Sequence, residues 1–189
     1  MQSLDLADGF DVGDPAAWED VGAVDLAFLN AGVDSGGAAI ADVSDEAYAR
    51  IRGANVDGVV YGVRRLARVM APGSRIVATA SLAGLVAMEL DPLYTLTKHA
   101  VVGFVRSVAP QLEARGIAIS AIAPGFADTP LVGETARAWA AGLGIPLLRA
   151  EDVAAAALAA SRGPAGAVWV VQPGRDPLEF RFPNVPGPR

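Results

Sequence analysis

VDLAFLNAG, residues 24–32, is the stretch that decides how this sequence folds. Its first six residues are almost continuously apolar, which is typical of a strand covered on both faces of a sheet. Three similar runs follow along the chain, and they are RIVATA at 75–80, IAISAI at 117–122 and AVWVV at 167–171. Helical patterns separate these runs, at 44–70, 92–114 and 150–161. The alternation predicts an α/β fold, a doubly wound parallel sheet in a single domain.

Length and composition limit the function classes that remain. The 189 residues can bury one substantial core. Apolar residues make up 52% of the chain, yet no run approaches the roughly 18 residues of a membrane span. The net charge of −6 argues against nucleic acid or a membrane surface as the partner. The chain lacks cysteine and begins with an acidic segment unlike a signal peptide, so we expect a cytoplasmic protein without a thiolate metal site.

Residues with useful chemistry follow the strands at their carboxyl ends, where open α/β sheets bind ligands. They are Asn30, Ala31 and Gly32 after the first strand, Ser81 after the second, and Pro124, Gly125 and Thr129 after the third. Because the ends of parallel strands meet at one edge, we expect these positions to converge on one rim of the sheet.

Tyr94 and Lys98, the only lysine of the chain, lie four residues apart on the expected helix 92–114. This spacing places both on one helix face. A tyrosine with a pKa of about 10 is a poor base at neutral pH, and a nearby ammonium lowers that pKa. The phenol could then exchange a proton with an alcohol or a ketone, with Ser81 bonding the reacting oxygen. The alternative interpretation is an ordinary pair of residues on a helix surface.

Five motifs stand in the order in which the short-chain dehydrogenase/reductase family has them. They are LNAG at 29–32, Asn55 in ANVDGV, Ser81 in ATASLAG, YTLTK at 94–98 and APGFADTP at 123–130. Over about residues 4–172 the sequence resembles the classical type of this family. The resemblance implies a Rossmann-like fold and an NAD(P)-dependent oxidoreductase that interconverts a secondary alcohol and a ketone.

The resemblance also implies roles for individual residues. Tyr94 would be the acid/base, Ser81 would orient the substrate oxygen, and Asn55 would hold a water in a proton relay. Lys98 would bind the nicotinamide ribose and lower the pKa of Tyr94. The cofactor-binding set would be Asp11, Val12, Asn30, Ala31, Gly32, Tyr94, Lys98, Pro124, Gly125 and Thr129. Asp11 and Val12 would form the end of a strand that contacts the adenine. The sequence does not distinguish NAD from NADP, because the residue that separates them in the family has no counterpart here.

Other segments allow weaker expectations. Residues 131–149, with Trp139, take the place of the family's substrate lid, and their apolar character favours a small apolar alcohol or ketone as substrate. His99 points about 140° around the helix from Tyr94, so we interpret it as a packing or interface residue. Glu89 and Asp91 are interpreted as solvated loop charges, although their loop could line the substrate pocket.

The resemblance implies a homodimer or homotetramer in which the two long helices, 44–70 and 92–114, pair across a two-fold axis. Small residues on these helices permit a close approach, and they are Gly58, Gly62, Ala100 and Gly103.

The family's glycine-rich TGxxxGxG turn, which cradles the cofactor pyrophosphate, has no match in the sequence. The segment 4–12 corresponds to the third strand of the order 3-2-1-4-5-6, so strands 1 and 2 are missing. We therefore expect residues 1–172 to form a partial, N-terminally truncated domain and 173–189 an irregular extension. An unpaired sheet edge along 24–29 would follow.

Three accounts of this truncation remain open. The chain is a fragment of a longer dehydrogenase, or a short form in which 4–12 pairs beside 24–29, or a non-catalytic remnant. The leading function is the oxidoreductase, and the alternative is a catalytically silent binding or oligomerisation subunit. An epimerase or dehydratase would share the residues Ser81, Tyr94 and Lys98, but the C-terminal part is too short for its substrate domain.

Overall fold

A computed structural model describes residues 3–183, and its centre is a five-stranded sheet. The strands are β1 (Leu26–Leu29), β2 (Arg75–Thr79), β3 (Ala118–Pro124), β4 (Val168–Val171) and β5 (Leu178–Glu179), in the order β1-β2-β3-β4-β5. The first four run parallel, whereas β5 pairs antiparallel with β4. The expected α/β fold is confirmed, and the four expected strands all form. The short strand β5 is an addition, since it lies in the tail that we expected to be irregular.

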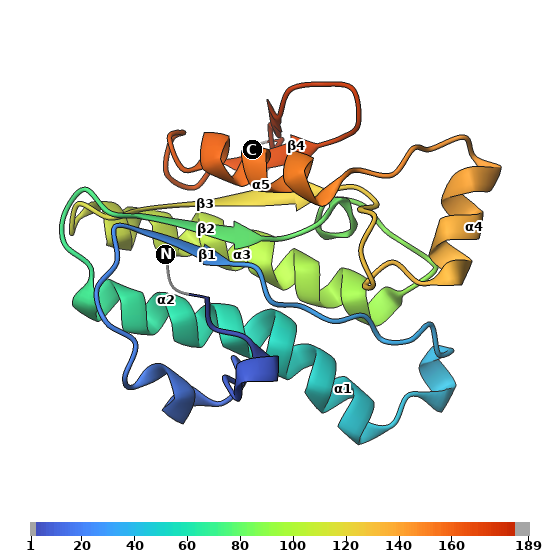
Figure 1. Ribbon diagram of the computed structural model, residues 1–189, viewed down its shortest axis with the longest axis horizontal. Coiled ribbons are helices and arrows are strands. Elements are labelled where there is room, and N and C mark those ends of the chain that lie inside the picture. Colours follow the sequence, from blue (N-terminus) through green and yellow to red (C-terminus); the bar gives the residue numbers. More distant parts are fainter. Residues whose placement is uncertain (1–2, 184–189) are drawn as a thin grey trace, which may run out of the picture.

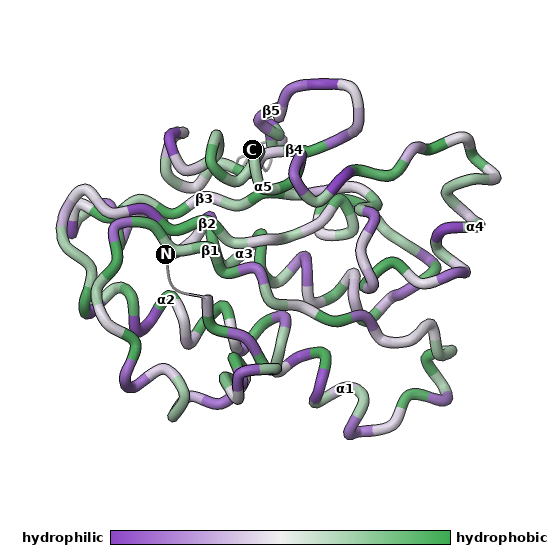
Figure 2. Tube along the Cα trace, viewed as in Figure 1, coloured by the Kyte–Doolittle hydropathy of each residue, from purple (hydrophilic) through white to green (hydrophobic). Residues whose placement is uncertain are grey.

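Helices cover both faces of the sheet (Figure 1). On one face lie α2 (Gly58–Val69) and α3 (Pro92–Glu113), and on the other lies α5 (Ala150–Ala160). Neighbouring residues of a strand therefore enter different cores: Ile76 of β2 packs under α2 and α3, while Val77 packs under α5. Figure 2 shows hydrophobic residues along the strands and a hydrophilic connection between β4 and β5.

The expected helix 44–70 forms as three consecutive pieces. It begins as α1 (Asp45–Arg52), capped by the Ser44 side chain, continues as a π-helical turn over Gly53–Asp57, and ends as α2. A π turn inserts one residue into a helix and is frequent at functional sites. In this chain the turn contains Asn55, which the sequence had singled out as a site residue.

Shorter elements complete the chain. One α-helix, α4 (Glu134–Gly142), forms within the expected lid segment. Four 3₁₀ turns lie at Leu6–Asp8, Pro15–Trp18, Ile40–Asp42 and Leu82–Gly84. Within residues 3–183 no helix is both long enough and apolar enough to cross a membrane.

The N-terminal segment is where the sequence prediction was wrong. Residues 4–12 form no strand, because Asp5 caps a 3₁₀ turn that Gly9 ends at a φ of 84°. The segment instead reaches the helices: the Phe10 ring meets Trp18 edge to face, and the Trp18 indole donates to the carbonyl oxygen of Val12. β1 is therefore an edge strand of the sheet. The account in which 4–12 pairs beside 24–29 is wrong.

Two of the glycines assigned to a subunit interface are used inside the chain. A Cβ on Gly58 would lie 2.8 Å from a Val12 methyl group, and one on Gly62 would lie 2.7 Å from the Trp18 ring. Both glycines are buried beneath the N-terminal segment, so they cannot face a second subunit. Gly103, by contrast, is exposed with no atom close to its missing Cβ. Pairing of the helices across a two-fold axis stays a prediction.

Candidate active site

Lys98 occupies the centre of the candidate site, at the carboxyl ends of β1 and β2. Its side chain is buried, with only 3% of the residue exposed. The Nζ atom donates to the carbonyl oxygen of Thr79 at 2.9 Å and lies 5.4 Å from the centroid of the Tyr94 ring. Burial lowers the pKa of Lys98 to about 8, because the charged form loses its hydration inside the protein.

The Tyr94 phenol lies at the start of α3 in surroundings that keep it protonated. Its pKa is raised to about 12, first by burial and then by the charges of Asp91 and Asp34, while the Ser81 side chain acts in the opposite direction. The pKa of Tyr94 is therefore raised overall, and not lowered as expected. Burial is the largest cause of the rise, because the charged phenolate loses hydration inside the protein.

Asn55 ties three segments together from inside the π turn. The residue is fully buried at 0% exposure. Its amide oxygen accepts from the Val33 backbone N–H at 2.8 Å, and its amide nitrogen donates to the Val33 carbonyl and to Thr97 Oγ1. Asn55 thereby fixes the loop after β1 to α3, a network that satisfies every hydrogen-bonding group it buries.

Several of the residues that follow the strands lie around Lys98 and Tyr94. Asn30 accepts a hydrogen bond from Thr79 Oγ1 at 2.8 Å. Gly32 lies so close that a Cβ there would stand 3.2 Å from Asn55 Oδ1 and 3.3 Å from Lys98 Nζ. On the other side, Ser81 Oγ accepts from the Ala83 N–H and donates over 3.4 Å to the carbonyl of Pro124. One rim is thus formed by Asn30, Gly32, Asn55, Lys98, Ser81 and Pro124.

Other predicted cofactor residues make their contacts elsewhere in the fold. Asp11 and Val12 are not at a strand end, because their segment turns toward α2. Thr129 lies in the loop after β3, where its carbonyl accepts from Arg137 of α4 at 3.0 Å. The Gly125 N–H donates to the carbonyl of Val171, which holds the start of that loop against the end of β4.

Sequence reasoning missed three residues that build the site. Thr79 contributes its carbonyl oxygen to Lys98 and its hydroxyl to Asn30, and Thr97 joins Asn55 to α3. Asp91 is no free loop charge, since it is the N-cap of α3 and accepts from the Tyr94 N–H. The signal for Asp91 was present, because an Asp followed by Pro marks the start of a helix, as Asp14-Pro15 also does.

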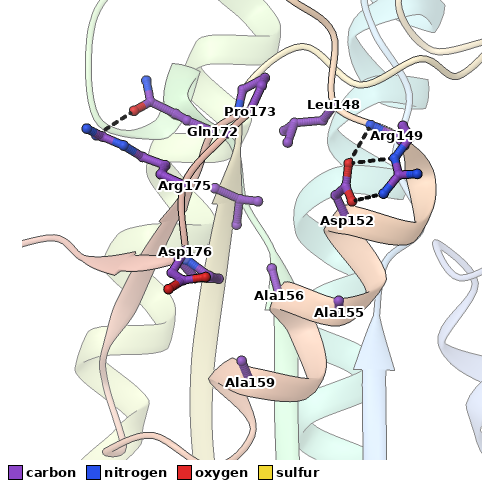
Figure 3. A pocket seen from close by; sticks show the side chains of 13 residues that line it. Leu148, Arg149, Asp152, Ala155, Ala156, Ala159, Gln172, Pro173, Arg175 and Asp176 are labelled. Atoms are coloured by element: carbon purple, nitrogen blue, oxygen red, sulfur yellow. Dashed lines mark hydrogen bonds and ion pairs between the residues drawn. The ribbon is translucent and has the colours of Figure 1, made fainter.

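A pocket of about 780 Å³ lies away from this rim, between α5 and the connection to β5. Figure 3 shows Ala155, Ala156 and Ala159 of α5 facing the connection, with the paired Arg149 and Asp152 near the start of the helix. The chemically equipped groups, Tyr94 and Lys98, do not line it. The candidate site is therefore assigned to the side chains around Tyr94 and Lys98, and not to this pocket.

Comparison with known proteins identifies the family. A family profile described as enoyl-(acyl carrier protein) reductase matches residues 15–168. Momilactone A synthase of Oryza sativa subsp. japonica is 36% identical over 151 residues, which are 72% of this chain and 55% of that protein. Cyclohexanol dehydrogenase of an Acinetobacter species is 35% identical over 115 residues, 60% of this chain and 46% of that protein. The chain belongs to the short-chain dehydrogenase/reductase family.

Solved structures agree with this assignment. A short-chain dehydrogenase from Burkholderia cenocepacia in complex with NADP superposes with a TM-score of 0.75 at 27% identity, covering 87% of this chain and 74% of that one. A short-chain type dehydrogenase/reductase from Mycobacterium marinum gives 0.74 at 27% identity, covering 87% and 72%. The chain spans about half the length of the curated relatives it matches.

Proposed function

We propose that this chain carries the catalytic residues of an NAD(P)-dependent oxidoreductase that interconverts a secondary alcohol and a ketone. The observation that carries the proposal is the buried Lys98, which lies beside Tyr94 and has no carboxylate partner within residues 3–183. A fold rarely buries a lysine without a countercharge unless the site uses it.

Tyr94 would be the acid/base of this reaction. With its pKa raised to about 12 the phenol is protonated at neutral pH, so it is ready to donate its proton to a ketone oxygen. Ser81 lies close enough to the phenol to influence its pKa and would hold the same substrate oxygen. As the phenolate forms, attraction to the Lys98 ammonium stabilises it. In the reverse direction the phenolate takes the proton of the alcohol.

The residues around Lys98 suit the nicotinamide half of the cofactor. A lysine ammonium has three N–H donors, and Thr79 accepts only one of them, which leaves donors for vicinal ribose hydroxyls. The absent side chain at Gly32 leaves room beside Lys98 and Asn55. Nicotinamide, when bound, supplies or accepts the hydride. The NADP held by the Burkholderia cenocepacia relative supports this assignment, and the preference between NAD and NADP stays open.

An apolar substrate is supported by the lid segment. Trp139 of α4 packs against Phe126, with ring centroids 5.7 Å apart, directly after the Pro124-Gly125 strand end. Leu131 and Val86 present exposed apolar surface in the neighbouring loops. A small apolar alcohol or ketone fits such walls, and the relative called cyclohexanol dehydrogenase is consistent with that class. We retain the expectation of a cytoplasmic homodimer or homotetramer without nucleic acid or membrane partners.

A second function is favoured by the edge of the sheet. Among the described residues β1 has a pairing partner on one side only, and Phe28 on it is 44% exposed. Such an edge is suited to pairing with another chain. The second candidate is therefore a catalytically silent binding or oligomerisation subunit.

Titration of the purified chain with NADH and NADPH, followed by cofactor fluorescence, separates the two functions. The oxidoreductase predicts saturable binding that Lys98→Met weakens at least tenfold, together with turnover of a member of a cyclic-ketone panel. Absence of both binding and turnover would contradict the oxidoreductase and favour the silent subunit. A version extended upstream with a glycine-rich turn tests whether that element restores binding.

A further inference from the structure

One carboxylate joins two segments that are 56 residues apart in the sequence. Asp91 Oδ1 accepts from the Tyr94 backbone N–H at 2.9 Å, which caps the first turn of α3. Asp91 Oδ2 accepts from the Ser35 N–H, also at 2.9 Å, in the loop that follows β1. The side chain is partly buried, so these two bonds are sheltered from competing water.

The loop that Asp91 holds is anchored at each of three consecutive residues. Asn55 bonds both backbone groups of Val33, Arg50 donates to the carbonyl of Asp34 at 2.8 Å, and Asp91 accepts from Ser35. Directly beyond it, Gly36 and Gly37 have φ values of 78° and 71°, which glycine adopts without strain. These two glycines therefore allow the chain to turn directly after Ser35, the residue that Asp91 holds.

The backbone of Tyr94 is held at both ends by the same network. Asp91 accepts from its N–H, and Thr97 Oγ1 donates to its carbonyl oxygen at 2.8 Å. Thr97 in turn accepts from Asn55. Tyr94 is thus tied to the loop after β1 by two routes, one through Asp91 and one through Thr97 and Asn55.

We propose that Asp91 is a positioning residue for Tyr94, whose carboxylate locks residues 33–35 against the first turn of α3 and so sets the place of the phenol on the rim. The proposal rests on the proposed function, in which Tyr94 is the acid/base. Asp91 needs no contact with substrate for this role, because it acts through the backbone of Tyr94.

The charge of Asp91 has a second, measurable effect on the same group. The charged and polar groups that face the Tyr94 phenol are Asp91, Asp34, Lys98 and Ser81, and the two aspartates raise its pKa. Removing the Asp91 charge therefore lowers the pKa of Tyr94.

Two variants separate the N-cap bond to Tyr94 from the bond to Ser35. Asp91→Ser keeps an N-cap oxygen, which serves about as well as aspartate at that position, but has no second oxygen for Ser35. Asp91→Ala removes both contacts. Asp14→Ser is the matched control, because Asp14 also caps a helical turn before a proline, with a 2.9 Å bond to the Ala16 N–H, and lies outside this network.

Hydrogen exchange measured by mass spectrometry tests whether Asp91 holds residues 33–35, and it does not require turnover. We expect Asp91→Ser to speed exchange in peptides covering 33–37 at least tenfold and to leave 93–97 near the wild-type rate. Asp91→Ala should speed both, and Asp14→Ser neither. Wild-type exchange of 33–37 in Asp91→Ser would overturn the proposal.

Fluorine NMR of protein labelled with 3-fluorotyrosine tests the positioning. The chain has three tyrosines, and Tyr94→Phe assigns the resonance. We expect Asp91→Ser to shift the Tyr94 resonance and to lower its titration midpoint, and Asp14→Ser to do neither. If the wild type turns over a ketone, Asp91→Ser should lower kcat at least tenfold with little change in the cofactor KM.

The outcomes distinguish the two proposals. A wild type without turnover contradicts the proposed function, while the exchange rates and the fluorine titration still decide the role of Asp91. A Tyr94 resonance and midpoint that are the same in Asp91→Ser as in the wild type would overturn the positioning role, even in an active enzyme.

Discussion

Lys98 donates a hydrogen bond from its buried Nζ to the carbonyl oxygen of Thr79, 2.9 Å away, and has no carboxylate partner among the described residues. The fold therefore bears the cost of a partly uncompensated cation at the strand ends. Such a cost is usual where a residue is kept for function and not for stability.

Replacing the buried cation should stabilise the chain and weaken its function. Lys98→Met fills a similar volume without a charge, and exchanging buried ionic groups for apolar ones is often neutral or stabilising by about 1–4 kcal/mol. We expect a higher free energy of unfolding in urea at pH 7, together with loss of cofactor binding. A variant that is less stable than the wild type by several kcal/mol would mean that Lys98 is a structural residue.

Stability should rise with pH in a window set by Lys98. Its pKa falls from 10.5 to about 8 on burial, so between these pH values the unfolded chain binds more protons than the folded chain. The free energy of unfolding therefore increases from about pH 8 toward pH 10, by at most about 3 kcal/mol over the full window. Below pH 8 this contribution is constant.

Urea unfolding of the wild type and Lys98→Met at several pH values between 7 and 10 checks the window. The increase should be present in the wild type and absent from the variant. If the free energy of unfolding changed with pH in the same way in both proteins, Lys98 would not titrate in this range.

Asn55 should be the most sensitive polar residue of the site. Asn55→Ala leaves the Val33 backbone groups without partners inside the protein, and a buried group without its hydrogen bond costs about 1–3 kcal/mol. We expect a loss of at least about 2 kcal/mol in urea unfolding. Thr97→Val removes the bond from the Asn55 amide and the bond to the Tyr94 carbonyl, which lies within α3, and should cost less. Equal losses in the two variants would contradict the central place given to Asn55.

The parallel sheet and its helices could be predicted from the sequence because buried strands and amphipathic helices have different periods. Ile76 and Val77 are both apolar since each enters a different core, and Asn30 and Thr79 meet because strand ends share an edge. The pattern of residues also placed Asn55 near the rim, although nothing in its neighbours revealed the π turn.

The remaining features depended on contacts that no local pattern contains. The strand expected at 4–12 rests on the family resemblance alone. The Asp5 cap and Gly9 turn this segment, and its contacts with the buried Trp18 hold it in place. The pKa of Tyr94 followed the depth of burial, which the spacing of Tyr94 and Lys98 does not reveal. Asp91 was missed because its second partner, Ser35, is distant in sequence.

Two glycines of the long helices should respond oppositely to alanine. Gly62→Ala places a methyl group against Trp18 and Leu29, and such overpacking costs about 1–3 kcal/mol. At Gly103 the helix position is exposed and has open space for a methyl group. Gly103→Ala should therefore raise the free energy of unfolding by about 0.5–1 kcal/mol. Thermal unfolding of both variants checks the pair, and a stabilised Gly62→Ala would contradict the packing of the N-terminal segment on α2.

Turnover by Tyr94→Phe tests the central claim most directly. The variant removes one hydroxyl, and with it the proton that the mechanism requires, while the residues around Lys98 stay in place. Measured by NAD(P)H absorbance with the ketone that the wild type reduces best, kcat should fall at least a hundredfold. The cofactor Kd should stay within about threefold, since that change is below about 0.7 kcal/mol. A variant that retained the wild-type kcat would contradict the assignment of Tyr94 as the acid/base.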